Sequence, residues 1–150
     1  MTRGPVDLKI VRDRLLLVEQ SLNDLRSLPQ ADLDQFTSDR RNILAADAAL
    51  RRGLEALFDV ARHLLAKGLG VGSLEYREVA RRAGEHDLVT DPSLATRLME
   101  MAGYRNRLTH HYDDVTPAEL FAVISRDLGD IEAVADSLRS AAARLAGHQT

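Results

Sequence analysis

Residues 36–64 read FTSDRRNILAADAALRRGLEALFDVARHL, and this stretch decides the fold. Large apolar residues return here at every seventh position, with two more between them: Phe36, Ile43, Leu50, Leu57 and Leu64, joined by Leu54 and Ala61. Because two turns of an α-helix contain about seven residues, this spacing draws one apolar stripe along a helix. The stretch therefore predicts a helix over residues 38–67 whose stripe packs against other helices.

The same periodicity marks four further segments. We predict helices over residues 6–28, 74–83, 92–110 and 117–146, with boundaries placed to about two to four residues. Asp91 is the expected N-cap before Pro92, which suits the first position of a helix. Thr116 and Glu119 have the spacing of a capping box, in which each side chain satisfies the other residue's backbone N–H.

No segment alternates apolar and polar residues as a strand does, so the predicted fold class is all-α. The glycine-rich residues 68–72 follow no strand, and we interpret them as a turn between helices, with Ser73 as the next N-cap. We expect a single domain over residues 1–150, built as an antiparallel bundle of four to five helices.

The composition excludes several classes of function. The 150 residues include no cysteine, so disulfides, thiol nucleophiles and cysteine-bound zinc are ruled out. Tryptophan is absent, and three Tyr and three Phe are too few for a platform on which bases stack. A net charge of -3 argues against coating nucleic acid with bulk positive charge but allows a local basic site. We see neither a signal peptide nor a membrane span and expect a cytoplasmic protein.

The richest chemistry lies in residues 103–114, GYRNRLTHHYDD, which gather arginine, histidine, tyrosine and carboxylate. Arg105 falls on the apolar face of the helix predicted over residues 92–110. An unpaired charge there is costly, so Arg105 must be paired, reach water or face a partner. Asp47 also falls on the apolar stripe of its own helix, and an Asp47–Arg105 ion pair is one candidate arrangement.

His110 follows Arg105 by five residues, which leaves the two side chains about 140° apart on a straight helix. They converge if the helix unwinds at His110, or if two copies of the segment face each other across a dimer. The small residues Ala102 and Gly103 favour a dimer because they let two helices approach closely. Gly103 also has a simpler explanation, since glycine only loosens a helix.

An arginine and a histidine suit RNA cleavage without a metal. Histidine moves protons near neutral pH, arginine stabilises charge on phosphate, and RNA supplies its own nucleophile in the 2′-hydroxyl. From the residues alone, helix capping and charge compensation by His110 and His111 are the stronger explanation. A metal site that adds Asp113 and Asp114 is weaker, because adjacent helical side chains point about 100° apart.

The motif and its flanks resemble the HepT toxins of the HEPN superfamily of helical ribonucleases. Arg105 and Asn106, followed by His110 and Tyr112, have the spacing of the HepT signature: arginine, a polar residue, three more, histidine, any residue, tyrosine. The flanking stretches follow in the order of that family: residues 49–55, 59–64, 68–70, Tyr76 and residues 101–103. The resemblance covers about residues 36–145.

The resemblance implies a HEPN-like bundle that forms a homodimer, with one composite site built from two motifs. It implies a metal-independent endoribonuclease that acts as the toxin of a toxin–antitoxin pair and needs no cofactor. Arg105 would then stabilise the scissile phosphate, His110 would be the general acid or base, and Asn106 would help to hold the site. Asp47 and His111 are candidate supporting residues.

The resemblance also implies two partners, an RNA substrate and an antitoxin like MntA, while neither DNA nor a membrane is expected. MntA is a minimal nucleotidyltransferase, and its relative here would transfer AMP from ATP-Mg onto Tyr112. The added phosphate would obstruct RNA by bulk and by like charge. Two alternatives stay open. One is a non-catalytic helical binding subunit of a two-component nucleotidyltransferase, and the other is a structural bundle with Arg105 fully paired and Tyr112 buried.

Overall fold

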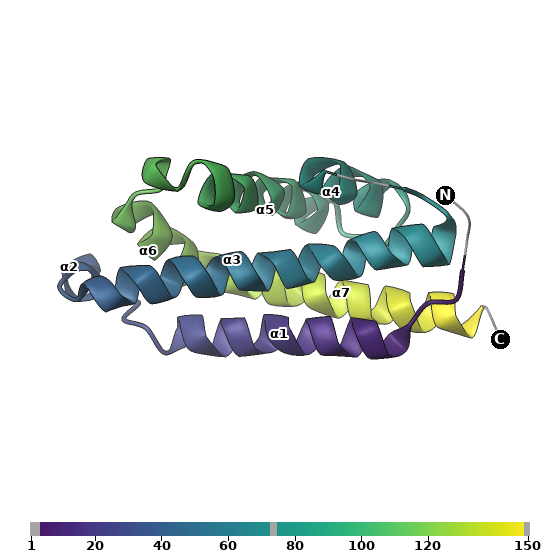
Figure 1. The fold of residues 1–150 in the computed structure, drawn as a ribbon, viewed down its shortest axis with the longest axis horizontal. Helices are drawn as coiled ribbons and strands as arrows, with labels where there is room; N and C mark the ends of the chain where they lie inside the picture. Colours follow the sequence, from purple (N-terminus) through teal and green to yellow (C-terminus); the bar gives the residue numbers. More distant parts are fainter. Residues whose placement is uncertain (1–3, 73–74, 149–150) are drawn as a thin grey trace.

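The computed structural model describes residues 4–72 and 75–148, and all regular structure within them is helical (Figure 1). These residues form α1 (Leu8–Arg26), α2 (Leu33–Thr37), α3 (Arg40–His63), the π-helix η1 (Leu64–Gly68), α4 (Tyr76–Glu85), α5 (Pro92–His110), the 3-10 helix η2 (Tyr112–Asp114), α6 (Pro117–Arg126) and α7 (Leu128–Gly147). The all-α class is confirmed. The expected four to five helices are too few, since the described residues form seven α-helices.

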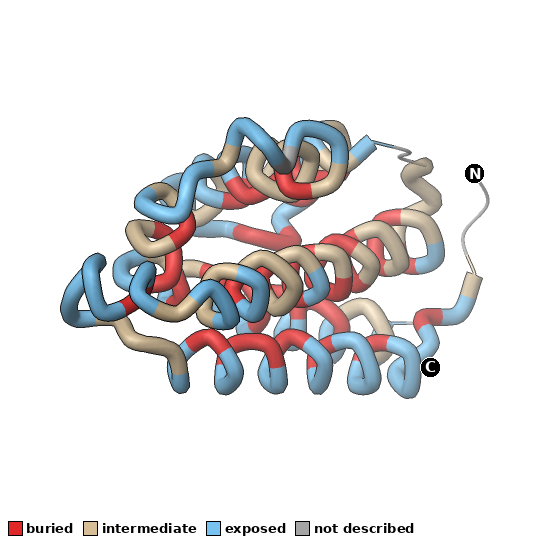
Figure 2. Tube along the Cα trace, turned by 60° about the vertical axis from the view of Figure 1, so that its left-hand side comes forward, coloured by how far each residue is buried: buried red, intermediate tan, exposed pale blue. Residues whose placement is uncertain are grey.

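The helix α3 runs through the middle of the bundle, with α1 and α7 on one side and α4 and α5 on the other (Figure 1). Its predicted apolar stripe is confirmed as the centre of the core, where Leu50 and Leu57 are at most 1% exposed. Two residues of the predicted stripe lie just beyond α3 and are equally buried: Phe36 belongs to α2, and Leu64 begins η1. Only Ile43 lies half-buried, near the amino end of α3. Burying each such large side chain contributes about 1.5–3 kcal/mol, so this stripe holds the layers together. In Figure 2 the buried residues of α1 face the rest of the bundle and its exposed residues face outward.

The close contact between α1 and α3 depends on a glycine. A Cβ atom at Gly53 would lie 2.9 Å from the Cβ of Ser21, shorter than carbon atoms of packed side chains allow. Glycine at this position therefore sets the distance between the two helices. The approach also buries Ser21 on α1.

The helix predicted over residues 117–146 is wrong in one respect, because the chain breaks at Asp127 into α6 and α7. The Asp127 N–H donates to the Val123 carbonyl at 2.8 Å, and its own carbonyl accepts from Asp130 N–H at 3.1 Å. At φ −106° and ψ −3°, Asp127 leaves ideal helical geometry. The bend lets α6 contact α2 and α3 while α7 packs along α1 and α5.

The predicted start of α5 and half of the capping box are confirmed. The Asp91 side chain accepts the N–H of Ser93 at 2.9 Å, and the Thr116 hydroxyl accepts the N–H of Glu119 at 3.1 Å. The other half of the capping box does not form. The Glu119 carboxylate reaches Arg107 instead, at 2.8 Å, because α5 brings that cation beside the start of α6.

The remaining boundaries lie close to the predicted ones. Both ends of α5 match residues 92–110, and α1 is shorter by two residues at each end. The helix α4 starts at Tyr76, while Ser73, its predicted N-cap, lies outside the described residues. Within the described ranges, no helix combines the length and the apolar character that crossing a membrane requires.

Candidate active site

The guanidinium of Arg105 is held between three helices. Arg105 projects from α5, and its side chain is only 15% exposed. Its Cζ lies 4.1 Å from the ring centre of Tyr76, the first residue of α4. Its Nη2 donates to Oε1 of Glu55 on α3 at 3.3 Å. The aromatic face and the carboxylate together offset the cost of taking this charge out of water.

This arrangement leaves much of the guanidinium unused. An arginine has five N–H donors, and Glu55 accepts from one nitrogen at a distance that is long for a charged hydrogen bond. The Nε of Arg105 is buried and has no hydrogen-bond partner within the described ranges. The expectation of the structural-bundle alternative, a fully paired Arg105, is therefore wrong. The Nη1 group makes no hydrogen bond to the described residues and remains able to meet an anion.

Asp47 does not pair with Arg105 among the residues described. It lies eight residues before Glu55 on α3, which is about 12 Å along the helix axis. Along the axis of α3, Glu55 lies at the height of Arg105 and Asp47 does not. The ion pair in the structure is therefore Glu55–Arg105 in place of the candidate Asp47–Arg105 pair. The Oδ1 of Asp47 is buried without a hydrogen-bond partner in the described structure.

The helix α5 stays regular as far as His110, so the first of the two alternatives, unwinding of the helix at His110, is wrong. His111 caps α5 with φ −137° and ψ 44°, and its N–H donates to the Arg107 carbonyl at 2.8 Å. Arg105 and His110 therefore diverge by about 140° around the helix. His110 is exposed where Arg105 is largely covered, and one copy of the chain does not turn the two side chains to the same face.

The structure also places two further motif residues, Asn106 and Tyr112, and the two small residues that precede Arg105 by two and three positions. Asn106 follows Arg105 on α5 and is half-buried. Tyr112 opens η2 just past the end of α5, as predicted, although its side chain lies outside the described residues. Ala102 is completely buried in the core of its own chain, so the proposal that it helps two copies approach is wrong. Gly103 is half-buried beside Arg77.

Arg107 fastens the motif to α6. Its Nη1 lies 2.8 Å from Oε2 of Glu119, and its Nη2 donates to the Asp114 carbonyl at 3.0 Å. The guanidinium also lies 5.7 Å from the ring centre of Tyr104. Burial, reinforced by the Glu119 carboxylate, raises the pKa of Tyr104 to about 12. The sequence marked Arg107 only as part of the motif, and the structure shows it as a brace.

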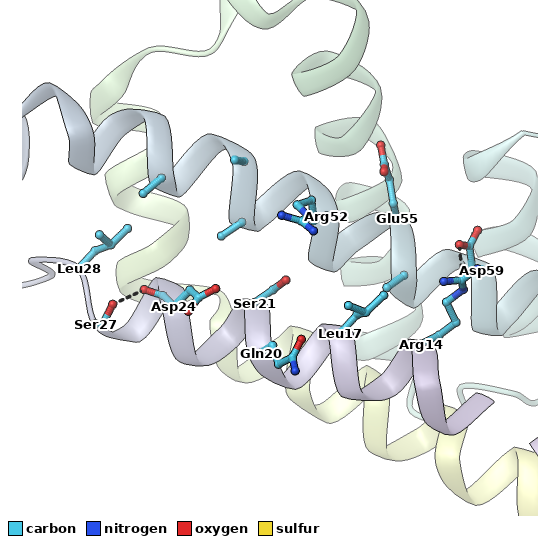
Figure 3. Close-up of a pocket in the computed structure, with 14 residues that line it drawn as sticks. Arg14, Leu17, Gln20, Ser21, Asp24, Ser27, Leu28, Arg52, Glu55 and Asp59 are labelled. Carbon is cyan, nitrogen blue, oxygen red and sulfur yellow. Dashed lines mark hydrogen bonds and ion pairs between the residues drawn. The ribbon is translucent and has the colours of Figure 1, made fainter. Parts of the chain in front are cut away.

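An open groove of about 580 Å³ lies between α1 and α3 (Figure 3). At one end Arg14 Nε approaches Asp59 Oδ2 at 3.6 Å, and burial raises the pKa of Asp59. Glu55 borders the groove, but its carboxylate points away from α1, consistent with its contact to Arg105 (Figure 3). Neither Arg105 nor His110 lines this groove.

Sequence reasoning missed two residues of the site, Tyr76 and Glu55. Both belong to stretches that carried the family resemblance, yet no spacing in the sequence connects either of them with Arg105. As for metals, no three His, Asp or Glu side chains in the described part of the chain are grouped to hold an ion.

Known proteins with similar sequences support the family expected from the motif. A family model described as ribonuclease HepT-like matches residues 18–138. The tRNA nuclease HepT of Aphanizomenon flos-aquae is 31% identical over 116 residues, which cover 77% of this chain and 78% of that protein.

Solved structures agree with the fold. A toxin–antitoxin complex with AMP-PNP has a chain with a TM-score of 0.75 at 22% identity, covering 86% of this chain and 97% of that one. The tri-AMPylated HEPN toxin of Shewanella oneidensis, in complex with its MNT antitoxin, has a TM-score of 0.77 at 22% identity, covering 87% and 97%. The bundle thus has the fold of HEPN toxins. With the family match over residues 18–138, the chain belongs to the HepT-like ribonuclease family.

Proposed function

We propose that this protein is a metal-independent endoribonuclease toxin whose substrate class is tRNA. The observation that carries the proposal is the family match across the motif, joined to a buried, partly unpaired Arg105 on α5. The exposed His110 ends the same helix. A relative that is 31% identical is named a tRNA nuclease, which makes tRNA the first substrate to test.

In the proposed reaction the RNA 2′-hydroxyl attacks the adjacent phosphorus as its proton passes to a base. The bond from phosphorus to the 5′-oxygen breaks, and that oxygen takes a proton from an acid. The products are a 2′,3′-cyclic phosphate and a 5′-hydroxyl end. Arg105 stabilises the charge on the phosphate oxygens, and the imidazole of His110 moves the protons. Asn106 helps to hold the site.

A composite site from two copies suits this chemistry better than a single chain. Arg105 and His110 of one copy diverge by about 140°, so a second copy must bring a histidine to the phosphate that Arg105 binds. We therefore propose a homodimer with motifs from both copies around one RNA strand. A monomeric protein that cuts tRNA at full rate when diluted well below micromolar concentration would contradict this arrangement.

The antitoxin in this proposal is a minimal nucleotidyltransferase resembling MntA. One similar solved structure is a toxin–antitoxin complex with AMP-PNP, and another is a tri-AMPylated HEPN toxin in complex with its MNT antitoxin. By position in the motif, Tyr112 would carry the AMP here, with His111 as a neighbour of lesser importance. Intact mass after co-expression with the antitoxin tests this step. We expect a gain of one or more AMP units in the parent protein and none in Tyr112→Phe.

Cleavage of tRNA in EDTA by the purified protein tests the function itself. We expect Arg105→Ala and His110→Ala to stop cleavage, while Arg139→Ala, which removes an exposed arginine on α7, leaves it unchanged. Undiminished cutting by both motif variants would overturn the assignment. A parent protein that binds nucleotide near the motif but cuts no RNA would instead favour the non-catalytic binding subunit.

A further inference from the structure

We propose that Tyr76 and Glu55 are positioning residues that fix the guanidinium of Arg105 for catalysis. This inference rests on the proposed ribonuclease function. The two residues, called the Arg105 clamp below, come from α4 and α3, whereas Arg105 comes from α5. The family motif contains neither of them, and their role follows from how three separate helices meet at one cation.

Tyr76 supplies one side of the clamp, and its own ring is held in place. It packs against the core, and its ring meets that of Phe58 edge to face, with centres 5.1 Å apart at 88°. The Cζ of Arg105 lies 4.1 Å from the same ring. A cation over an aromatic face is held more strongly when water is excluded, and Arg105 is only 15% exposed. A fixed ring therefore limits the movement of the guanidinium.

Glu55 supplies the other side of the clamp and engages only one edge of the cation. Its Oε1 accepts from Nη2 at 3.3 Å, and its side chain is 38% exposed. A carboxylate repels RNA phosphate, so it helps catalysis only if it orients the guanidinium and leaves other donors for the substrate. The single contact meets that condition, since it engages Nη2 alone and leaves Nη1 without a hydrogen bond to the described residues.

The geometry predicts a kinetic effect of loosening the clamp. A misplacement of about 1 Å in a catalytic group can slow chemistry roughly 100-fold, because the group no longer meets the transition state squarely. A loosened Arg105 would still attract phosphate, so substrate binding should change much less than the rate. The expected result is a fall in kcat with KM little changed or lower.

Replacing Tyr76 separates the ring from its hydroxyl. Tyr76→Leu keeps apolar bulk against the core but removes the aromatic face, and we expect kcat for tRNA cleavage to fall roughly tenfold or more. Tyr76→Phe keeps the face and should stay within about twofold of the parent protein. Equal rates for Tyr76→Leu and the parent would overturn the inference, as would a Tyr76→Phe variant as slow as Tyr76→Leu.

Replacing Glu55 tests the second side. Glu55→Ala should lower kcat roughly tenfold, and Glu55→Gln should restore most of it because the amide oxygen can still accept from Nη2. The matched control is Glu78→Ala, which removes a 3.0 Å ion pair to Arg82 on α4 whose carboxylate is similarly exposed. A loss in the control as large as that in Glu55→Ala would mean general loss of folded protein and would overturn the specific role.

Arg62 shares the ring of Tyr76 at 5.2 Å, so its effect must be separated from that of Arg105. We expect Arg62→Gln to leave kcat within about twofold, because the clamp acts on Arg105, which lies closer to the ring. If Arg62→Gln alone reproduces the loss seen in Tyr76→Leu, the ring acts through Arg62 and the inference is wrong.

A second measurement keeps the clamp testable without catalysis. The side-chain Nε–Hε resonance of Arg105, identified by its disappearance in Arg105→Lys, should move when the ring is removed in Tyr76→Leu and stay in place in Tyr76→Phe. If the parent protein cuts no tRNA, the proposed function is wrong. The shift then supports only the contact between the Tyr76 ring and Arg105, its absence overturns that contact as well, and the catalytic role of the clamp is overturned in either case.

Discussion

Two arginines on α5, only two residues apart, lie in opposite circumstances. Arg105 turns inward between α3 and α4, with one contact of 3.3 Å to a carboxylate and an aromatic face beneath it. Arg107 turns toward α6, where it contacts Glu119 at 2.8 Å and the Asp114 carbonyl at 3.0 Å. Arg105 therefore has N–H donors without a partner in the described structure, whereas Arg107 donates to two groups of the protein.

The difference contrasts the arginine that we propose for catalysis with an arginine that joins two helices. Arg107 is more exposed than Arg105, at 38% against 15%, yet it has the closer anionic partner. An exposed cation needs no such partner to remain charged, so the contacts of Arg107 serve to join α5 to α6. A largely buried cation with spare donors is costly, and the proposed binding of an RNA phosphate would offset that cost.

The largest expected effect is on catalysis, through replacement of each arginine by lysine. Lysine keeps the charge but loses the planar fork of donors. Arg105→Lys should lower kcat for tRNA cleavage roughly tenfold to 100-fold. Arg107→Lys should remain within about threefold, because an ammonium still pairs with Glu119. Initial rates on labelled tRNA in EDTA measure both, and equal losses would erase the distinction between the two cations.

The next effect is on stability, where we expect the larger loss on the Arg107 side and the smaller loss on the Arg105 side. Glu119→Gln weakens a short, half-buried ion pair that joins two helices, so it should lower the free energy of unfolding by about 1 kcal/mol. Glu55→Gln should lower it by less than about 0.5 kcal/mol, because its contact is longer, at 3.3 Å, and the amide oxygen can still accept from Nη2. Urea unfolding followed by circular dichroism makes the comparison, with Glu132→Gln as a surface control. A larger loss in Glu55→Gln would make Arg105 the structural member of the pair.

The smallest effect is an alkaline one, confined to the Arg107 side. Burial and Glu119 raise the pKa of Tyr104 to about 12, while an unfolded chain loses this proton near pH 10. Stability should therefore be intact below about pH 10 and decline as the pH rises toward 12. Tyr104→Phe should flatten this decline, and Glu119→Gln should reduce it in part. Unfolding free energies at about pH 9 and pH 11 test the sign. An equally steep decline in Tyr104→Phe would assign it to other groups.

The sequence predicted the helices wherever an apolar stripe and a capping signal agree. The helix α5 matches at both ends because Asp91 with Pro92 starts it and the motif residues end it. The break at Asp127 was missed, since Ile124, Leu128 and Ile131 continue the helical spacing straight through it. An apolar stripe indicates which side of a helix faces the core, but it does not reveal where the helix changes direction.

The motif residues of the candidate site could be predicted from their spacing in the sequence, but the residues from other helices that contact them could not. Spacing identified Arg105 and His110, and helix geometry gave their divergence of about 140°. The partner of Arg105 was not predictable, because Asp47 and Glu55 both lie on α3 and only the axial offset between α3 and α5 selects one. The contact of Tyr76 with Arg105 was not predictable either, because it depends on how α4 packs beside α5. The family motif names residues on one helix, whereas their orientation depends on neighbours from others.

The two contacts of Arg107 also join the end of α5 to the two segments that follow it in the chain, η2 and α6. One leads to the first turn of α6 and the other to the carbonyl that ends η2, so the short turn carrying Tyr112 is anchored on both sides. A movement of this turn would disturb the contacts that Arg107 makes from α5. A protein that binds this turn would therefore contact a segment that Arg107 joins to α5, between the two residues on which cleavage is proposed to depend.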